Sequence, residues 1–234
     1  MRILALETTD KAGGVAALDG HNLLACIDLS PQERSAQALA PAIHALWRDV
    51  GWQPGDMQLI AVAVGPGSFT GLRVGITMAK TLAYALGCEV SGVHTLEVIA
   101  SQTPAVAERL HVWLDAQREQ VFAATFACRP GERPTCLAPA RILDNAAAVA
   151  SLSPGDFVSG PALRKLAPQV PSGVHVVAEE FWRPTATAIG LLALRRYEAG
   201  ERDDLWKLAP LYLRQSAAEE KWARQQKDQK SLSP

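Results

Sequence analysis

The sequence lacks the features that define several classes of protein. Its four cysteines, at positions 26, 88, 128 and 136, form no C-x-x-C pair, which excludes zinc knuckles and thioredoxin-like redox motifs. The formal net charge is −1 over 234 residues. The chain as a whole therefore does not attract nucleic acid, and any RNA contact needs a local basic patch or a partner.

Long apolar segments are also missing. The longest uncharged stretch, residues 57–72, is interrupted by Gly65, Pro66 and Gly67, so it cannot form a membrane-spanning helix. The opening residues, MRILALETT, lack the apolar run of a secretion signal. We therefore expect a cytoplasmic protein with reduced thiols and no contact with a membrane.

The histidines are too widely spaced for a helical metal site. The closest pair, His94 and His111, is separated by 17 positions, whereas a metal-dependent transferase or peptidase typically places two histidines four apart on one helix face. We expect no metal site, and we interpret the histidines as structural or surface residues.

The residues that are present predict an α/β protein with a packed core, since 48% are hydrophobic and 20% are charged. The first hundred residues have the pattern of three strands, a helix that begins near Ser35, a strand, a helix that ends near Leu86, and a strand. A looser version of the same order follows Pro104. The sequence thus predicts two related lobes, residues 1–104 and 105–213, and a flexible tail over residues 214–234.

The stretch AVGPGSFTGLRVG, residues 63–75, joins a predicted strand to a predicted helix. It lacks the lysine of a Walker loop, the third glycine of a dinucleotide fingerprint and the glycines of a nucleophile elbow. What remains is a helix N-terminus with Ser68 or Thr70 as its cap. Such an end either attracts an anion or is simply capped by its own hydroxyl group.

The glycines of this stretch form a second pattern. Gly67, Gly71 and Gly75 lie four apart, and Ala79 and Ala83 continue the series, which places them on one side of a helix. Glycine costs a helix interior about 1 kcal/mol relative to alanine, so we infer that another backbone approaches this side closely. That backbone belongs either to the core of the same lobe or, in the interpretation we favour, to a second polypeptide.

Four segments together resemble one family. VAVGPGSFTGLRVGITMAKTLAYALG is similar to the signature of the bacterial TsaB (YeaZ-like) proteins, ILALETT to their first strand and turn, LDAQREQVFAATF to their second-lobe hairpin, and APLYLR to their C-terminal motif. The resemblance covers residues 1 to about 215. The sequence departs from the family pattern at two places: Arg34 precedes Ser35 where many members have histidine, and the turn SGPAL lacks the fuller glycine pattern. Both departures weaken the case for a nucleotide site but not the case for a scaffold role.

The resemblance implies a two-lobed actin/Hsp70/sugar-kinase-like α/β fold, in which a ribonuclease H-like motif is duplicated. It also implies a non-catalytic dimerisation subunit. Such a subunit pairs with a catalytic paralogue, TsaD, which transfers a threonylcarbamoyl group to N6 of the adenosine next to the anticodon of tRNA, and an ATPase subunit, TsaE, joins the pair. The expected partners are TsaD, TsaE and, in their absence, a second copy, with tRNA contacted indirectly. No cofactor is expected on this chain alone, and a nucleotide at the subunit interface is left open.

Family members build a helical bundle from the two helices of the first lobe, and the small-residue stripe fits this arrangement. The predicted partner-interface residues are Leu39, Ile43, Leu46, Gly71, Leu72, Gly75, Ile76, Ala79, Leu82, Ala83 and Leu86. A small-molecule phosphotransferase of the same fold and a protease-like binding protein are the alternative functions.

Phosphotransferases of this fold hold an acidic residue at the end of the first strand, where Glu7 stands; a capped turn is the alternative. Asp115 and Arg118 lie on the corresponding hairpin of the second half, and face either an interlobe cleft or an ion-pair partner in their own lobe. Arg73, in the first turn of its helix, opposes the helix dipole and suggests an anionic partner. The candidate anion or nucleotide contacts are Glu7, Thr8, Thr9, Gly67, Ser68, Thr70, Arg73 and Arg118.

Overall fold

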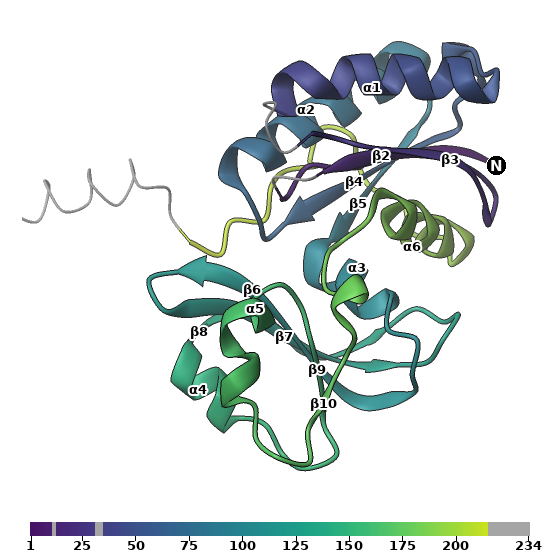
Figure 1. Cartoon of the computed structure of the whole chain (residues 1–234). Helices are drawn as coiled ribbons and strands as arrows, with labels where there is room; N and C mark the ends of the chain where they lie inside the picture. Colours follow the sequence, from purple (N-terminus) through teal and green to yellow (C-terminus); the bar gives the residue numbers. More distant parts are fainter. Residues whose placement is uncertain (11–12, 31–34, 215–234) are drawn as a thin grey trace, which may run out of the picture.

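The computed structural model describes residues 1–10, 13–30 and 35–214, which form two lobes, one above the other in Figure 1. The first lobe contains a five-stranded sheet of order β3-β2-β1-β4-β5, in which β1, β2 and β3 are antiparallel and β4 and β5 run parallel to β1. Its elements are β1 (Arg2–Glu7), β2 (Gly14–Asp19), β3 (Asn22–Asp28), α1 (Ser35–Val50), η1 (Pro54–Asp56), β4 (Leu59–Gly65), α2 (Phe69–Leu86) and β5 (Glu89–His94).

The second lobe repeats this topology. Its sheet has the order β10-β9-β6-β7-β8, again with three antiparallel strands followed by two strands parallel to the first. The predicted two-lobed actin/Hsp70/sugar-kinase-like fold with a duplicated ribonuclease H-like motif is therefore confirmed. Helix α3 (Thr95–Ser101) follows β5 and leads into the second sheet. The elements after it are β6 (Ala107–Gln117), β7 (Gln120–Cys128), β8 (Thr135–Asp144), α4 (Asn145–Ala150), β9 (Phe157–Ser159), α5 (Leu163–Leu166), η2 (Ala167–Gln169), β10 (His175–Val176), η3 (Glu179–Phe181) and α6 (Ala186–Glu198).

The helix that follows the fifth strand of each sheet packs on the other lobe. Ile189 and Leu192 of α6 share a core with Ile3 of the first sheet, while Ile99 of α3 shares a core with Leu110 of the second sheet. The strands of the first sheet end at His94 and those of the second begin at Ala107, so the predicted boundary at residues 104 and 105 stays a prediction. The two cores are not divided at any one point of the chain, because α3 and α6 each pack on the other lobe. The apolar face of a sheet must be covered by another element. Helices α3 and α6 lie between the two sheets (Figure 1), and each covers the inner face of the sheet of the other lobe.

Helices α1 and α2 cover the opposite face of the first sheet, as Figure 1 shows. Strand β4 is buried along its whole length because it is covered on both faces. Leu39 and Leu46 of α1 and Ile76 of α2 pack against Leu4 and Leu6 of β1. This packing fixes the end of β1 against the start of α2, where the candidate site lies.

A segment without regular structure, residues 203–214, crosses the first lobe after α6; we call it the C-terminal strap, and it is yellow in Figure 1. Its Leu211 amide donates to the carbonyl of Val64 at 2.7 Å, and its last residue, Arg214, donates to the carbonyl of Ala116 in the second lobe. Apart from Arg214, the predicted flexible tail lies outside the described residues.

Ion pairs also hold the lobes together. Arg133, in the loop between β7 and β8, donates from Nε to Oε1 of Glu97 at 2.8 Å and contacts Glu201 through a second nitrogen. On the other side, Arg183 lies 3.0 Å from a carboxylate oxygen of Asp10, just after β1. The lobes are thus linked by charged groups as well as by their exchanged helices.

Candidate functional site

The turn after β1 is organised by the carboxylate of Glu7, which is only 1% exposed. Its Oε1 accepts hydrogen bonds from the amide of Thr9, from the hydroxyl of Thr9 at 2.6 Å and from the amide of Asp10 at 3.3 Å, while Oε2 has no partner among the described residues. Burial raises the pKa of Glu7 to about 7, although these hydrogen bonds oppose the shift. Glu7 therefore holds its own turn, which is the capped-turn alternative.

The three glycines of α2 and its preceding loop pack against this same turn. A methyl group at Gly71 would lie 1.8 Å from the carbonyl oxygen of Thr8, and one at Gly75 would lie 2.2 Å from the hydroxyl oxygen of Thr8. A methyl group at Gly67 would lie 2.6 Å from the Cβ atom of Thr9. The backbone that approaches the stripe is therefore the end of β1 in the same lobe.

The inference that the stripe is left bare for a second polypeptide is wrong. Its members face the interior of their own lobe: the glycines meet Thr8 and Thr9, and Ala79 and Ala83 are buried in the core. Leu82 and Leu86 are partly buried against that core. The other predicted interface residues are buried: Leu39, Ile43, Leu46, Gly71, Leu72, Gly75, Ile76, Ala79 and Ala83. Whether a partner binds elsewhere on these helices stays a prediction.

The N-terminus of α2 is capped by its own chain. Ser68 Oγ accepts from the amide of Gly71 at 3.2 Å, and the amide of Ser68 donates to the carbonyl of Thr9 at 2.8 Å. Thr70 is exposed at the same end. The structure thus brings seven of the eight candidate anion contacts to one corner of the first lobe, where two amide groups that an anion would use are already engaged.

The remaining charge at this corner also has a partner within the chain. The guanidinium of Arg73 stacks on Phe69, with 4.8 Å to the ring centroid, and its Nε donates to the hydroxyl of Tyr212 in the C-terminal strap at 3.0 Å. Phe69 and Tyr212 stack on each other at 4.0 Å. Packing of the strap therefore accounts for an arginine that the sequence suggested was facing an external anion.

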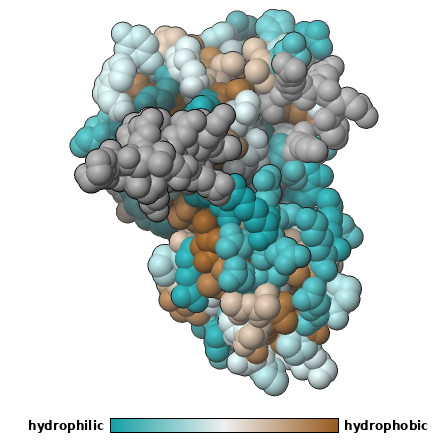
Figure 2. Space-filling model, turned by 90° about the vertical axis from the view of Figure 1, so that its left-hand side faces the viewer, coloured by the Kyte–Doolittle hydropathy of each residue, from teal (hydrophilic) through white to brown (hydrophobic). Residues whose placement is uncertain are grey.

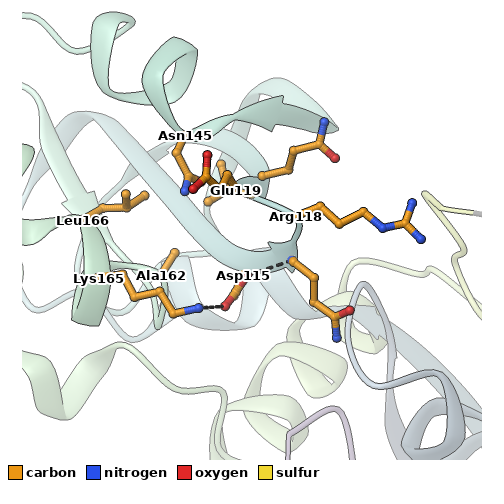
Figure 3. Close-up of a pocket in the computed structure, with 10 residues that line it drawn as sticks. Asp115, Arg118, Glu119, Asn145, Ala162, Lys165 and Leu166 are labelled. Carbon is orange, nitrogen blue, oxygen red and sulfur yellow. Dashed lines mark hydrogen bonds and ion pairs between the residues drawn. The ribbon is translucent and has the colours of Figure 1, made fainter.

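The eighth candidate, Arg118, lies on the hairpin between β6 and β7, beside a cavity of about 240 Å³. Three consecutive residues at this turn, 117 to 119, have positive φ angles between 54° and 61°, which is uncommon for residues other than glycine. In Figure 3 the side chain of Arg118 extends away from Asp115 and Asn145. The hairpin is held by the amide of Asn145, which donates to the carbonyl of Glu119 at 2.9 Å.

Asp115 pairs within its own lobe, with Lys165 Nζ at 2.6 Å (Figure 3). Partial burial would raise the pKa of Asp115, but hydrogen bonds from Lys165 and from the amide of Gln117 hold it below its usual value. On the other side of the cavity, Oδ1 of Asn145 is buried without a partner among the described residues. Lys165 and Asn145 were not predicted, because contacts between distant segments leave no periodic signal in the sequence.

The outward surface of α1 and α2 is uncharged over much of its extent. The exposed residues of α1 include Ala40, Pro41 and His44, and those of α2 include Thr77 and Thr81. Helix α2 contains no aspartate or glutamate. Figure 2 shows apolar and hydrophilic side chains mixed over one side of the molecule, with apolar atoms reaching the surface of the upper lobe.

Residues 1–10, 13–30 and 35–214 contain no group of three or more histidine, cysteine, aspartate or glutamate side chains that could hold a metal ion. None of the helices in these ranges is both long and apolar enough to span a bilayer.

Comparisons with known proteins agree with this fold. The family model of TsaD, described as tRNA N6-adenosine threonylcarbamoyltransferase, matches residues 30–193, and the chain belongs to this family. The chain is 36% identical to the tRNA threonylcarbamoyladenosine biosynthesis protein TsaB of Bacillus subtilis over 132 residues, which are 56% of this chain and 57% of that protein. Its identity to Escherichia coli TsaB is 33% over 128 residues, 54% of this chain and 55% of that protein. The match thus spans little more than half of each relative.

Among solved structures, YeaZ from Pseudomonas aeruginosa superposes with a TM-score of 0.75 at 26% identity, over 91% of this chain and 99% of that one. Within its family, the chain is therefore a TsaB/YeaZ-like protein.

Proposed function

We propose that this chain is a non-catalytic subunit in the synthesis of N6-threonylcarbamoyladenosine in tRNA, where it binds and positions the catalytic paralogue TsaD together with the ATPase subunit TsaE. The names of its TsaB relatives and its family membership support the pathway. The observation that carries the non-catalytic role is the state of Glu7. Its carboxylate is 1% exposed, and Oε1 accepts hydrogen bonds from its own turn.

This geometry argues against the alternative of a small-molecule phosphotransferase. A carboxylate that organises magnesium and phosphates needs its oxygens directed at the ligand. Glu7 instead directs Oε1 at Thr9, and the neighbouring amide of Ser68 donates to the carbonyl of Thr9. Phosphotransfer from ATP by this chain alone would contradict the proposal.

The partner surface in this proposal is the outward face of α1 and α2, since the inward face is occupied by the chain's own sheet. Interface cores are depleted of charged residues, and Ala40, Thr77 and Thr81 are exposed, small and uncharged. A second helical pair can therefore pack closely here without burying an unpaired charge. A second copy of the chain would occupy the same face when the paralogue is absent.

Co-purification with TsaD and TsaE, followed by modification of unmodified tRNA, tests the proposal. We expect Thr77→Arg and Ala40→Arg to abolish both the complex and the modification, because a buried unpaired charge costs several kcal/mol, while the melting temperature stays that of the parent. Ala147→Arg, at an exposed position of α4 in the other lobe, is the matched control and should assemble normally. Normal assembly of both α1 and α2 variants would contradict the surface we propose.

A further inference from the structure

A second hollow lies on the face of the lower sheet opposite α3. Strand β7 lies between β6 and β8 there, and it contributes two small residues to this face. In register, Ala123 lies between Trp113 of β6 and Arg141 of β8, and Thr125 lies between His111 and Ala138. Neighbouring strands are about 4.8 Å apart, so the small side chain of Ala123 leaves a gap of roughly 10 Å between Trp113 and Arg141.

The gap is a cavity of about 320 Å³, which is within the range of small-molecule sites. Helices α4 and α5 have six and four residues and cover only part of this face. They seal one end, where Trp113 packs against Ala148 and Leu163. Leu137, which is 51% exposed, lines the uncovered part.

A buried histidine, hydrogen-bonded to an aspartate behind it, forms one wall of the hollow. His111 and Asp156 have side chains that are each 6% exposed, with 3.1 Å between Nε2 and Oδ2. Nδ1 of His111 lies 3.4 Å from the hydroxyl of Thr125. Burial lowers the pKa of His111, against the opposing effect of Asp156. The ring is therefore neutral at neutral pH, donates from Nε2 to Asp156, and leaves Nδ1 as an acceptor for Thr125.

The carboxylate of Asp156 is already used by groups behind the wall. It accepts from the amide of Ser153 at 2.9 Å and from His111, and it lies 3.6 Å from Nε of Arg109. Among the described residues, no aspartate or glutamate side chain lines the hollow itself. The lining therefore contains two guanidinium groups, Arg109 and Arg141, and no carboxylate.

Arg141 is the more available of the two cations. It is exposed, and it forms no ion pair with any residue in the part of the chain that the structure describes. The side chain of Arg109 is 51% exposed, and among the described residues its one ion pair is the 3.6 Å contact with Asp156. Guanidinium groups bind carboxylates and phosphates through charge-assisted hydrogen bonds, which are strongest where water is partly excluded. An apolar floor beside two such groups is the arrangement that a small organic anion requires.

We propose that this hollow binds a small organic oxyanion, a carboxylate or a phosphate monoester, with its charged group at Arg141 and Arg109 and its apolar body against Ala123 and Leu137. The site lies on the second lobe, apart from the proposed partner surface on α1 and α2, and it does not depend on the proposed function. His111 and Asp156 act as positioning residues that hold Thr125 and Arg109 around the hollow.

Binding of three probes to the full chain tests the site: benzoate, phenyl phosphate and the neutral benzyl alcohol. We expect saturable binding of at least one of the two anions at one site by calorimetry, with shifts of the NMR signals of the His111 ring, and no saturable binding of the alcohol. The anion that binds more tightly identifies which oxyanion the site prefers. Equal binding of the alcohol, or no saturable binding of either anion, would overturn the proposal.

Variants assign the binding to this hollow. Arg141→Gln should weaken the bound anion at least about tenfold, because it removes a charge-assisted hydrogen bond. Ala123→Leu should fill the cavity and abolish binding, provided its melting curve shows a folded protein. Arg48→Gln, at an arginine of α1 whose side chain is 74% exposed, is the control and should bind as the parent does. Unchanged affinity in Arg141→Gln would overturn the assignment whatever the outcome for Ala123→Leu.

Discussion

Gly71 and Thr8 are in backbone contact. A Cβ atom at Gly71 would lie 1.8 Å from the carbonyl oxygen of Thr8, and the Thr8 hydroxyl donates to the carbonyl of Gly71 at 2.8 Å. The end of β1 therefore lies so close to α2 that there is no room for a side chain at position 71, and only glycine fits there. This contact fixes the corner of the first lobe at which seven of the eight candidate anion contacts meet.

Replacing Gly71 by alanine should destabilise the protein. Alanine gains about 1 kcal/mol of helix propensity over glycine, but the methyl group would force the Thr8 backbone away, and overpacking of this kind typically costs about 1–3 kcal/mol or more. We expect a net loss in the free energy of unfolding, measured by urea denaturation.

Gly55→Ala is the matched control, because a Cβ atom at Gly55 would meet nothing within 4 Å and Gly55 does not have a positive φ angle. Its stability should be unchanged or slightly raised. If Gly71→Ala is as stable as Gly55→Ala, the close contact with Thr8 does not exist in solution.

The glycine series shows how far the sequence could predict this site. Spacing by four residues indicated a close backbone approach to α2, and that approach exists. The identity of the approaching chain could not be inferred, because a strand of the same lobe and a helix of a partner impose the same requirement for small residues. Thr8 and Gly71 are 63 positions apart in the sequence, so their contact leaves no local signal.

The fold was predictable where the pattern was local. The order of strands and helices in the first lobe follows directly from alternation and from helical periodicity. The exchange of α3 and α6 between the lobes was not predicted. The apolar face of a helix shows that the helix covers a sheet, but it does not show which of the two sheets is covered. The order is looser after Pro104 in part because β8, a ten-residue edge strand, is largely exposed and lacks the continuous apolar run of a central strand.

Glu7→Gln should change how stability depends on pH. Burial raises the pKa of Glu7 from 4.5 to about 7, so the folded protein binds this proton more tightly than the unfolded chain. The resulting contribution to stability is complete below pH 4.5 and is lost as the pH rises through about 7. We expect the stability of the parent relative to the variant to fall by about 3 kcal/mol across this range.

Urea denaturation of both proteins on each side of this range measures the difference. Glutamine keeps the Oε1 acceptor for Thr9 and has no charge to lose, so the variant should lack this part of the pH dependence. Glu108→Gln, at an exposed position of β6, controls for removal of a carboxylate. A constant difference between the parent and Glu7→Gln at all pH values would show that Glu7 is not buried as described.

Arg133→Gln should loosen the contact between the lobes. Glu97 is 8% exposed, and its carboxylate accepts from Nε of Arg133 at 2.8 Å, so the variant leaves a largely buried charge without this partner. The expected cost is about 1–3 kcal/mol in urea denaturation, with faster hydrogen exchange in α3. Arg129→Gln, at an exposed arginine of the same loop, is the control and should change neither the stability nor the hydrogen exchange of α3.

The double variant Arg133→Gln, Glu97→Gln should recover part of the stability that Arg133→Gln loses, because the glutamine at position 97 leaves no buried charge without a partner. If instead the two single losses simply add, the pair of Arg133 and Glu97 does not contribute to the contact between the lobes.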